Sequence, residues 1–236
     1  MGILAIRFMI SVILPTYNEA ENIRELITRI NHNVHGCEIL VVDDDSPDMT
    51  WKLASGMKLK NVRVIRRVGE RGLASAIFRG IMESKGDVVV WMDCDLSMPP
   101  EVIPRLLSAV DGCDVAIGSR YVRGGRDRRS FVRVFGSWLI NGFATVILGY
   151  GIRDYDSGFV AARKKVFGRV KFQATGYGEY CIRFLYDCAR KGFVVREVPY
   201  VFTDRRKGKS KSTANLLAMV RHPLVYFWNI VRIRLR

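Results

Sequence analysis

The sequence has few acidic residues for its length and lacks several features that mark special classes of protein. Its 236 residues include 23 Asp and Glu but 38 Lys and Arg, with only 7 prolines. We find no repeat with a period of about 20 to 50 residues and no low-complexity tract, which argues against repeat arrays and long disordered segments. Because 49% of the residues are hydrophobic, the chain can bury one core, and we expect a single compact domain with a modified tail.

Cysteine is also scarce, and its spacing excludes the usual cysteine-built folds. No two cysteines stand in a CxxC pattern, and five in 236 residues are too few for a secreted disulfide scaffold. A reducing, cytoplasmic setting fits this usage. The N-terminus has no basic leader followed by a small-residue cleavage site, so we interpret its apolar run as the first strand with a short extension. The cysteines are Cys37, Cys94, Cys113, Cys181 and Cys188.

The shortage of acidic residues gives a formal net charge of +15. Such an excess favours partners that carry phosphate, namely nucleotides, nucleic acid or an anionic membrane face. The basic residues gather in three segments, 120–133, 205–211 and 221–236. A run of like charges can also be a solvated face. A nucleic-acid-binding module is disfavoured because zinc spacings, RNP-like aromatics and a recognition-helix pattern are missing, and because aspartates cluster at the expected strand ends.

Short β-branched runs alternate with longer segments of helical periodicity. One predicted helix begins at Asn18, which is a good N-cap, and another follows Pro99 and Pro100. Nearly continuous apolar strands separated by helices are typical of an α/β fold, with a mostly parallel sheet covered on both faces. Ligands bind at the carboxyl ends of such strands. The predicted strands are Ile10 to Leu14, Ile39 to Val42, Val62 to Ile65, Val88 to Trp91 and Val115 to Ile117.

The residues that follow the predicted strands carry the candidate chemistry. The sequence PTYNE after the first strand can aim an aromatic ring and a carboxylate over the sheet edge, or can simply form a turn and a helix cap. The second strand is followed by the acidic cluster Asp43 to Asp48, which is costly unless it binds a ligand or a cation. Asp93 and Asp95 follow the fourth strand. Residues i and i+2 of an extended chain point the same way, so both carboxylates can face one divalent cation and leave positions open for phosphate oxygens.

Seven motifs, taken in this order and spacing, resemble inverting family 2 glycosyltransferases, and most closely dolichol-phosphate (polyprenol-phosphate) mannose synthases. The resemblance covers about residues 9 to 211. It implies a GT-A (Rossmann-like) mostly parallel sheet flanked by helices, in a single domain with interfacial helices. The motifs are PTYNE, VVDDDSPD, ERGLASA, MDCDLS, GSRY, DSGF and FTDRRKGKSK.

The resemblance also implies roles for individual residues. Asp93, Asp95 and Ser97 are expected at the metal, which would be Mg²⁺ or Mn²⁺. Arg120 is expected near the sugar and phosphates, and Arg205 and Lys211 form a basic pair on a loop over the diphosphate. Asp95, Arg120, Arg205 and Lys211 are therefore the expected catalytic residues. The expected donor-binding residues are Pro15, Tyr17, Glu19, Val42, Asp44, Asp93, Cys94, Asp95, Ser97, Arg120, Arg205 and Lys211.

The implied reaction is transfer of mannose from GDP-mannose to dolichyl (polyprenyl) phosphate with inversion. An acceptor phosphate is already anionic at neutral pH, so fixed cations that hold two anionic reactants together matter more than a general base. Close relatives often carry an FQ pair where this chain has 176–181 as GYGEYC. Transfer of glucose or N-acetylglucosamine from a UDP-sugar therefore stays open. Asp154 and Asp156 can orient the sugar or only cap a turn.

Two apolar segments with arginines suggest contact with a membrane. The segment at about 130–150 is interrupted by Ser137 and Asn141, and the tail 212–236 mixes aromatic residues with arginines. A spanning helix needs about 20 predominantly apolar residues, so helices lying in the interface fit better, although both segments can also pack as core helices. We expect a catalytic domain over 1–211, a membrane-associating helix over 212–236, and a peripheral protein on the cytoplasmic face, with a possible membrane-anchoring subunit.

Overall fold

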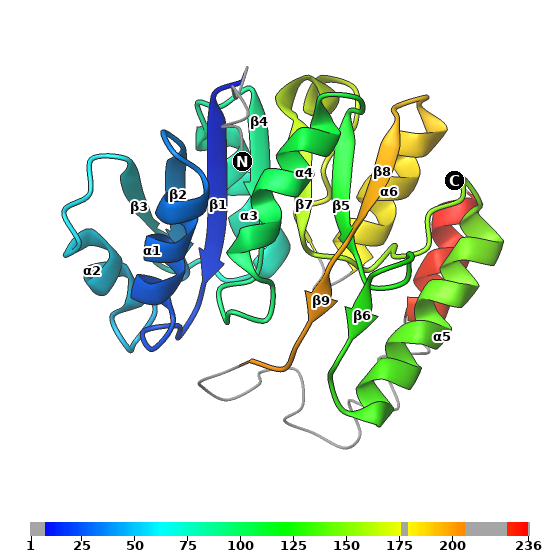
Figure 1. Ribbon diagram of the computed structural model, residues 1–236, viewed down its shortest axis with the longest axis horizontal. Coiled ribbons are helices and arrows are strands. Elements are labelled where there is room, and N and C mark those ends of the chain that lie inside the picture. Colours follow the sequence, from blue (N-terminus) through cyan, green and yellow to red (C-terminus); the bar gives the residue numbers. More distant parts are fainter. Residues whose placement is uncertain (1–7, 176–178, 206–225, 236) are drawn as a thin grey trace.

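The computed structural model describes residues 8–175, 179–205 and 226–235. Its centre is a seven-stranded sheet in the order β3-β2-β1-β4-β7-β5-β8, beside a two-stranded sheet of β6 and β9 (Figure 1). Only β7 runs antiparallel to its neighbours β4 and β5, so the sheet is mostly parallel, as predicted. The strands are β1 (Ile10–Thr16), β2 (Glu38–Asp43), β3 (Val62–Arg66), β4 (Val88–Trp91), β5 (Val115–Ser119), β6 (Arg126–Asp127), β7 (Val160–Arg163), β8 (Val195–Pro199) and β9 (Val201–Phe202).

Helices cover both faces of the large sheet, and side-chain alternation along β1 shows how. Val12 and Leu14 belong to a buried cluster with α1 and α4, whereas Ile13 belongs to a second cluster with α3 and α6. α3 lies very close to the sheet, because a Cβ on Gly80 would stand 2.4 Å from Ile13 Cγ2. The helices are α1 (Ile23–Asn33), α2 (Thr50–Ser55), α3 (Leu73–Glu83), α4 (Ile103–Val110), α5 (Phe131–Leu148) and α6 (Glu179–Arg190), with short 3₁₀ turns η1 (Pro100–Val102) and η2 (Lys164–Gly168).

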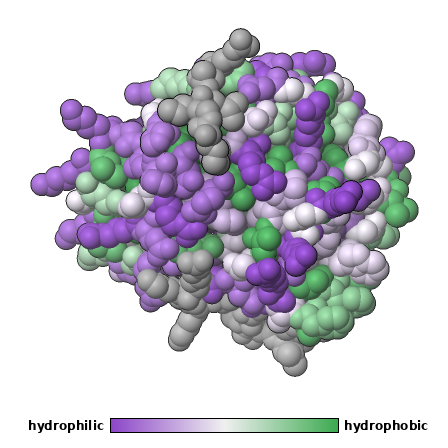
Figure 2. All heavy atoms as spheres, viewed as in Figure 1, coloured by the Kyte–Doolittle hydropathy of each residue, from purple (hydrophilic) through white to green (hydrophobic). Residues whose placement is uncertain are grey.

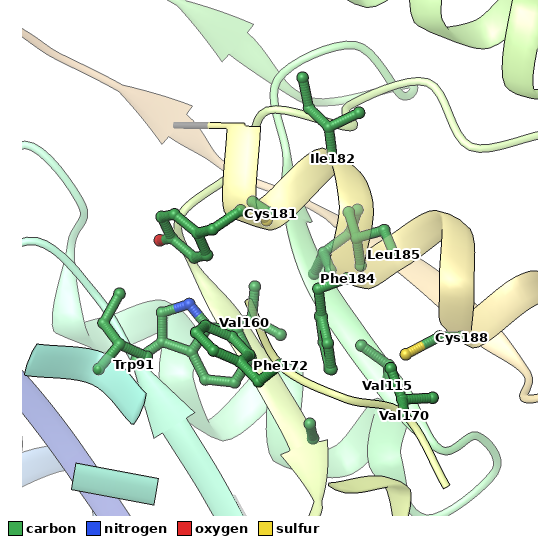
Figure 3. Close-up of a cluster of buried hydrophobic side chains, with 14 of the residues drawn as sticks. Trp91, Val115, Val160, Val170, Phe172, Cys181, Ile182, Phe184, Leu185 and Cys188 are labelled. Atoms are coloured by element: carbon green, nitrogen blue, oxygen red, sulfur yellow. The ribbon is translucent and has the colours of Figure 1, made fainter. Parts of the chain in front are cut away.

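An aromatic cluster anchors the end of β4. Trp91 is fully buried and meets Phe172 and Phe184 edge-on, at ring-centroid distances of 6.0 and 5.5 Å. Figure 3 shows these residues close together beside α6. Because buried aromatic side chains contribute much of the hydrophobic stabilisation of a core, this packing fixes the strand end from which Asp93 and Asp95 emerge.

The predicted start of the first helix at Asn18 is wrong. Asn18 lies in a turn with a left-handed φ of 54°, its backbone N–H donates to Ser46 Oγ, and α1 begins only at Ile23. The N-cap of α1 is Asn22, so Asn18 and the turn that follows it lie outside the helix. The turn holds Tyr17 and Glu19 near the carboxyl end of β1, where both side chains line a pocket.

α5 lies at the edge of the molecule, beside the helical residues 226–234 (Figure 1). Phe143 and Phe227 join the two with an edge-on ring contact at 4.8 Å. The predicted apolar segment at about 130–150 is thus one helix. The predicted boundary at residue 211 falls within 206–225, outside the described residues, and stays a prediction.

All five cysteines are buried and free.

Candidate active site

The strand order places a crevice at the carboxyl ends of β1 and β4. From β1 the sheet continues through β2 and β3 on one side and through β4 on the other, so the direction of winding reverses between β1 and β4. Doubly wound sheets bind ligands at such a reversal. The PTYNE segment follows β1 and the MDCDLS segment follows β4, so the structure brings the two predicted motifs together at this point.

Two pockets meet there and share Leu73, Asp93, Asp95 and Arg205. We call the one beside β1 the Tyr17 pocket and the one beyond β4 the Arg120 pocket. Residues that line the Tyr17 pocket are Pro15, Thr16, Tyr17, Glu19, Asp44, Arg71, Gly72, Leu73, Ala76, Asp93, Cys94, Asp95 and Arg205. Those that line the Arg120 pocket include Asp93, Asp95, Ser97, Arg120, Arg129, Arg133, Asp156, Tyr180, Tyr200, Phe202, Asp204 and Arg205.

Asp95 is held by a local turn and by a distant arginine. Its Oδ1 accepts hydrogen bonds from the backbone N–H of Ser97 at 3.0 Å and from Ser97 Oγ at 2.5 Å. Leu96 between them has a left-handed φ of 62°, which allows this tight turn. Arg205 Nη2 donates to Asp95 Oδ2 at 3.1 Å and lies 3.6 Å from Glu19 Oε1. Ser97 thus orients Asp95, and Arg205 lies where the two pockets meet.

Asp93 is a carboxyl group surrounded by other carboxyl groups. Burial, together with the nearby carboxylates of Asp95 and Glu19, raises the pKa of Asp93 to about 7, although Arg205 opposes the shift. A bound cation would relieve this repulsion. Within the described residues, no group of three or more His, Cys, Asp and Glu side chains is arranged to hold a metal ion by itself. The pair therefore fits a cation that also takes oxygen ligands from a substrate, which is how Mg²⁺ is often bound in phosphate sites.

The Arg120 pocket is lined by arginines and aspartates, and two of its arginines, Arg120 and Arg129, are fixed by buried acids. Arg120 is only 6% exposed and makes hydrogen bonds to Asp154 at 2.6 to 2.9 Å. Its Nη1 also lies 3.6 Å from Asp127, which in turn accepts bonds from Arg129. Two-point pairing of this kind holds a guanidinium in one orientation.

The two aspartates near DSGF, which the sequence could not tell apart, have different positions in the structure. Asp154 is fully buried and is the partner of Arg120, so it is not placed to orient a sugar directly. Asp156 lines the Arg120 pocket. Burial raises its pKa to about 6, against the opposing effect of Arg120. A carboxyl group that lines a pocket can accept a hydrogen bond from a sugar hydroxyl, so Asp156 is the better placed of the two for that contact.

The structure supports the remaining predicted donor-binding residues to different degrees. Val42 is fully buried within β2 and lines neither pocket. The Cys94 side chain is buried, with Sγ donating to Pro15 O at 3.3 Å, so it joins the two strand ends and also lines the Tyr17 pocket. Lys211 lies outside the described residues, and its role stays a prediction.

Sequence reasoning missed two arginines of the Tyr17 pocket region. Arg67 is buried and donates through Nε to Asp44 Oδ1 at 2.7 Å, and Arg71 lines the pocket itself. The signal was present in ERGLASA, where Gly72 adopts a φ of 148° that favours glycine and donates its N–H to Asp44 Oδ2 at 2.8 Å.

Comparison with known proteins agrees with this geometry. Residues 11–170 match the family described as glycosyl transferase family 2. The chain belongs to this family. It is 45% identical over 212 residues to a dolichol-phosphate mannosyltransferase of Pyrococcus furiosus, covering 86% of this chain and 58% of that protein, so it spans less than two thirds of the relative's length. It is 40% identical to a polyprenol monophosphomannose synthase of Mycolicibacterium smegmatis, covering 86% of this chain and 81% of that protein.

Solved structures of other proteins share the fold. Glucosyl-3-phosphoglycerate synthase from Mycobacterium tuberculosis, in complex with Mn²⁺, UDP and glucosyl-3-phosphoglycerate, superimposes with a TM-score of 0.71 and 23% identity. The match covers 96% of this chain and 81% of that one. It confirms the predicted GT-A class of α/β fold.

Proposed function

We propose that this glycosyltransferase moves mannose from GDP-mannose to dolichyl or another polyprenyl phosphate, with inversion, giving a β-linked mannosyl phosphate and GDP. The observation that carries the proposal is the meeting of two different pockets at Asp93 and Asp95. One pocket has an aromatic wall and an acidic end suited to a nucleoside, and the other is lined by arginines suited to a phosphate. The names of the relatives from Pyrococcus and Mycolicibacterium support this choice of donor sugar and acceptor.

The diphosphate of the donor is assigned to the junction of the pockets. Asp93 and Asp95 would hold Mg²⁺ or Mn²⁺ there, and such an ion supplies charge neutralisation for the departing nucleoside diphosphate. The turn through Leu96 and the hydroxyl of Ser97 keep the Asp95 carboxylate in place. The Arg205 guanidinium, between Asp95 and Glu19, stands beside the same position and can hydrogen-bond a phosphate oxygen of the leaving group.

The acceptor phosphate is assigned to the Arg120 pocket. Arg120, Arg129 and Arg133 all line it, and each is held by an aspartate: Arg120 by Asp154, Arg129 by Asp127 and Arg133 by Asp204. Their fixed cations bring an anionic nucleophile to an anionic donor, which is otherwise disfavoured by repulsion. A phosphate oxygen then attacks the anomeric carbon on the face opposite GDP. The new carbon–oxygen bond forms as the bond to the diphosphate breaks, and the configuration inverts.

The acceptor carries a long apolar chain, and α5 offers a surface for the membrane that contains it. In length and composition α5 could cross a membrane: it has 18 residues and a mean hydropathy of 1.6, and 17% of it is buried. One side, however, packs on the domain. There Asn141 Oδ1 accepts a bond from the backbone N–H of Asp156, and Thr145 Oγ1 donates to Ile152 O. A helix with one side fixed to a folded domain fits the membrane interface better than a spanning position.

The other side of α5 is exposed and apolar. Phe131 and Val146 are each 81% exposed and Trp138 is 56% exposed. Figure 2 shows hydrophobic atoms toward the lower right, where Figure 1 places α5, and mainly hydrophilic atoms toward the left. Such a face can enter the interface while nearby arginines meet lipid phosphates. This supports a peripheral protein. We propose in addition that the protein lies on the cytoplasmic face and has a membrane-anchoring subunit as a partner.

The test is a matrix of radiolabelled nucleotide sugars against polyprenyl phosphates. GDP-mannose, UDP-glucose and UDP-N-acetylglucosamine are each incubated with the full chain, a divalent cation and dolichyl or undecaprenyl phosphate in detergent. Products are then extracted into organic solvent. The proposal predicts labelled lipid from GDP-mannose only. Labelled lipid from a UDP-sugar alone would refute the proposed donor.

A further inference from the structure

The Tyr17 pocket contains groups that can distinguish one nucleobase from another, and this inference rests on the donor assigned above. The pocket runs from Asp44, just past the end of β2, to Asp95, past the end of β4, with β1 between them. Neighbouring strands lie about 4.8 Å apart, so the two ends are separated by roughly 10 Å. With the diphosphate at the Asp95 end, the base reaches the Asp44 end.

Asp44 is held in one orientation and has little acceptor capacity left. Its Oδ1 accepts from both Nε and Nη2 of Arg67, and its Oδ2 accepts from the backbone N–H of Gly72 at 2.8 Å. A carboxylate has about four acceptor positions. Three N–H groups of the described residues thus occupy all but one, and the remaining position is on Oδ2.

One acceptor position on a carboxylate suits one ring N–H of a base. Guanine and uracil carry a ring N–H between two exocyclic groups, whereas adenine and cytosine have a lone pair at the corresponding ring nitrogen. The carboxylate of Asp44 therefore favours guanine and uracil over the other two bases. A single bond of this kind does not separate guanine from uracil, so a second group is needed for that choice.

Arg71 supplies that second group. It precedes Gly72, whose backbone N–H binds Asp44 Oδ2, and both Arg71 and Asp44 line the Tyr17 pocket. Its guanidinium lies 4.2 Å from the ring centroid of Tyr17, and its Nη2 donates to the Tyr17 hydroxyl at 2.6 Å. The stack holds the planar fork of N–H donors at the pocket wall, although Arg71 is otherwise exposed.

Guanine offers a matching pair of acceptors, O6 and N7, and arginine recognises that pair by two parallel bonds. O6 adjoins the ring N–H that Asp44 would accept, so both contacts suit one placement of the base. Uracil has an O4 acceptor followed by a C–H, so it can take only one of the two bonds. We propose that Arg71 selects guanine over uracil in the donor nucleotide, acting beside Asp44, which selects the ring N–H.

The experiment measures nucleotide binding by calorimetry, with no transfer reaction involved. GDP, UDP and 7-deaza-GDP, which lacks the N7 acceptor, are titrated into wild type, Arg71→Ala and Arg71→Lys in the presence of Mn²⁺. Arg79→Ala is the matched control, because Arg79 is an exposed arginine of α3 paired with Glu83 outside the pocket. Thermal unfolding of each variant verifies that the fold is retained.

We expect wild type and the Arg79 variant to bind GDP at least about tenfold more tightly than UDP or 7-deaza-GDP. In Arg71→Ala, GDP and 7-deaza-GDP bind equally, and GDP affinity falls about tenfold more than UDP affinity, because GDP loses two bonds to Arg71 and UDP at most one. Arg71→Lys lies between, because an ammonium group lacks the planar fork.

Two results overturn the inference in distinguishable ways. If Arg71→Ala keeps the wild-type preference for GDP, or weakens GDP and UDP equally, Arg71 is not the selector and the proposed function is unaffected. If wild type binds UDP more tightly than GDP, the proposed donor fails along with this inference.

Discussion

Arg120 and Asp154 form a buried pair joined by three hydrogen bonds. The backbone N–H and Nε of Arg120 donate to Asp154 Oδ2 at 2.8 and 2.9 Å, and Nη2 donates to Oδ1 at 2.6 Å. Asp154 is fully buried and Arg120 is nearly so. The pair joins the end of β5 to the loop before β7, and it directs the arginine into the pocket assigned to the acceptor phosphate.

Removing Asp154 should therefore damage the fold as well as the site. Asp154→Ala leaves a buried guanidinium without its main partner, which costs about 3–5 kcal/mol of unfolding free energy. Asp154→Asn keeps the shape and one acceptor oxygen, so its loss should be smaller. Urea denaturation followed by circular dichroism measures both. Equal stability of wild type and Asp154→Ala would show that the pair does not hold this loop.

Arg133 should affect the acceptor more than the donor. It lines the Arg120 pocket, is partly buried, and is bonded to Asp204 at 2.9 Å. Loss of a charge-assisted hydrogen bond to phosphate is worth about 1.5–3 kcal/mol, so Arg133→Ala should raise KM for dolichyl phosphate by about tenfold or more. KM for GDP-mannose should change less than about twofold.

Arg105→Ala is the control for this measurement, because Arg105 is an exposed arginine on α4 that does not line the pocket. Steady-state kinetics of wild type and both variants, with each substrate varied in turn, gives the comparison. A larger rise in the donor KM than in the acceptor KM would place Arg133 on the donor instead.

Much of the fold was predictable, because the strands are recognisable in the sequence as short β-branched runs. All five predicted strands are present, and the parallel arrangement follows from the helices between them. β7 and β8 were not predicted. β7 pairs antiparallel between β4 and β5, and this position depends on long-range packing that a local pattern does not encode. The start of α1 was misplaced because Asn18 suits a left-handed turn as well as a helix cap.

The site was predictable where short spacing decides geometry and unpredictable where pairing across the sheet decides it. Asp93 and Asp95 face the pockets as their spacing predicted. The two readings of Asp154 and Asp156 could not be separated, because the answer depends on Arg120, 34 residues before Asp154 in the sequence. Arg67 escaped notice for the same reason, since its partner Asp44 belongs to a different strand end.

Asp127 should give the protein a specific sensitivity to acid. Its burial would raise its pKa, but the hydrogen bonds and charge of Arg129 outweigh burial and lower it. A depressed pKa contributes stability that is fully present above the unfolded value of about 3.9 and is lost as pH falls through the folded value.

Wild type should therefore have a higher unfolding free energy than Asp127→Asn. The difference should be largest near pH 6 and should shrink as the pH falls from about 4 to 3. Urea titrations of both proteins at several pH values measure it. A difference that stays constant or grows toward acid would contradict the assignment.

The exposed side of α5 should decide membrane binding. Phe135 is 49% and Trp138 is 56% exposed on this helix. Replacing both by Glu should lower the fraction that sediments with anionic liposomes several-fold, because two apolar anchors are lost and negative charge is added near lipid phosphates. Thermal stability should change little, since neither side chain is buried.

Met82→Glu on α3 is the matched control, because Met82 is 65% exposed and lies on another helix. If that substitution reduces sedimentation as much as the double change on α5, then α5 has no special part in binding.

The central claim is that Asp95 and its neighbour Asp93 bind the donor diphosphate through a divalent cation. The direct measurement is GDP affinity of wild type and Asp95→Asn, each with Mn²⁺ and with chelator, alongside transfer of labelled mannose to dolichyl phosphate. We predict that Mn²⁺ tightens GDP binding about tenfold or more in wild type and hardly at all in Asp95→Asn, and that the variant transfers no detectable mannose while keeping the wild-type melting temperature. Equal GDP affinity with and without Mn²⁺ in wild type, or full transfer by Asp95→Asn, would contradict the claim.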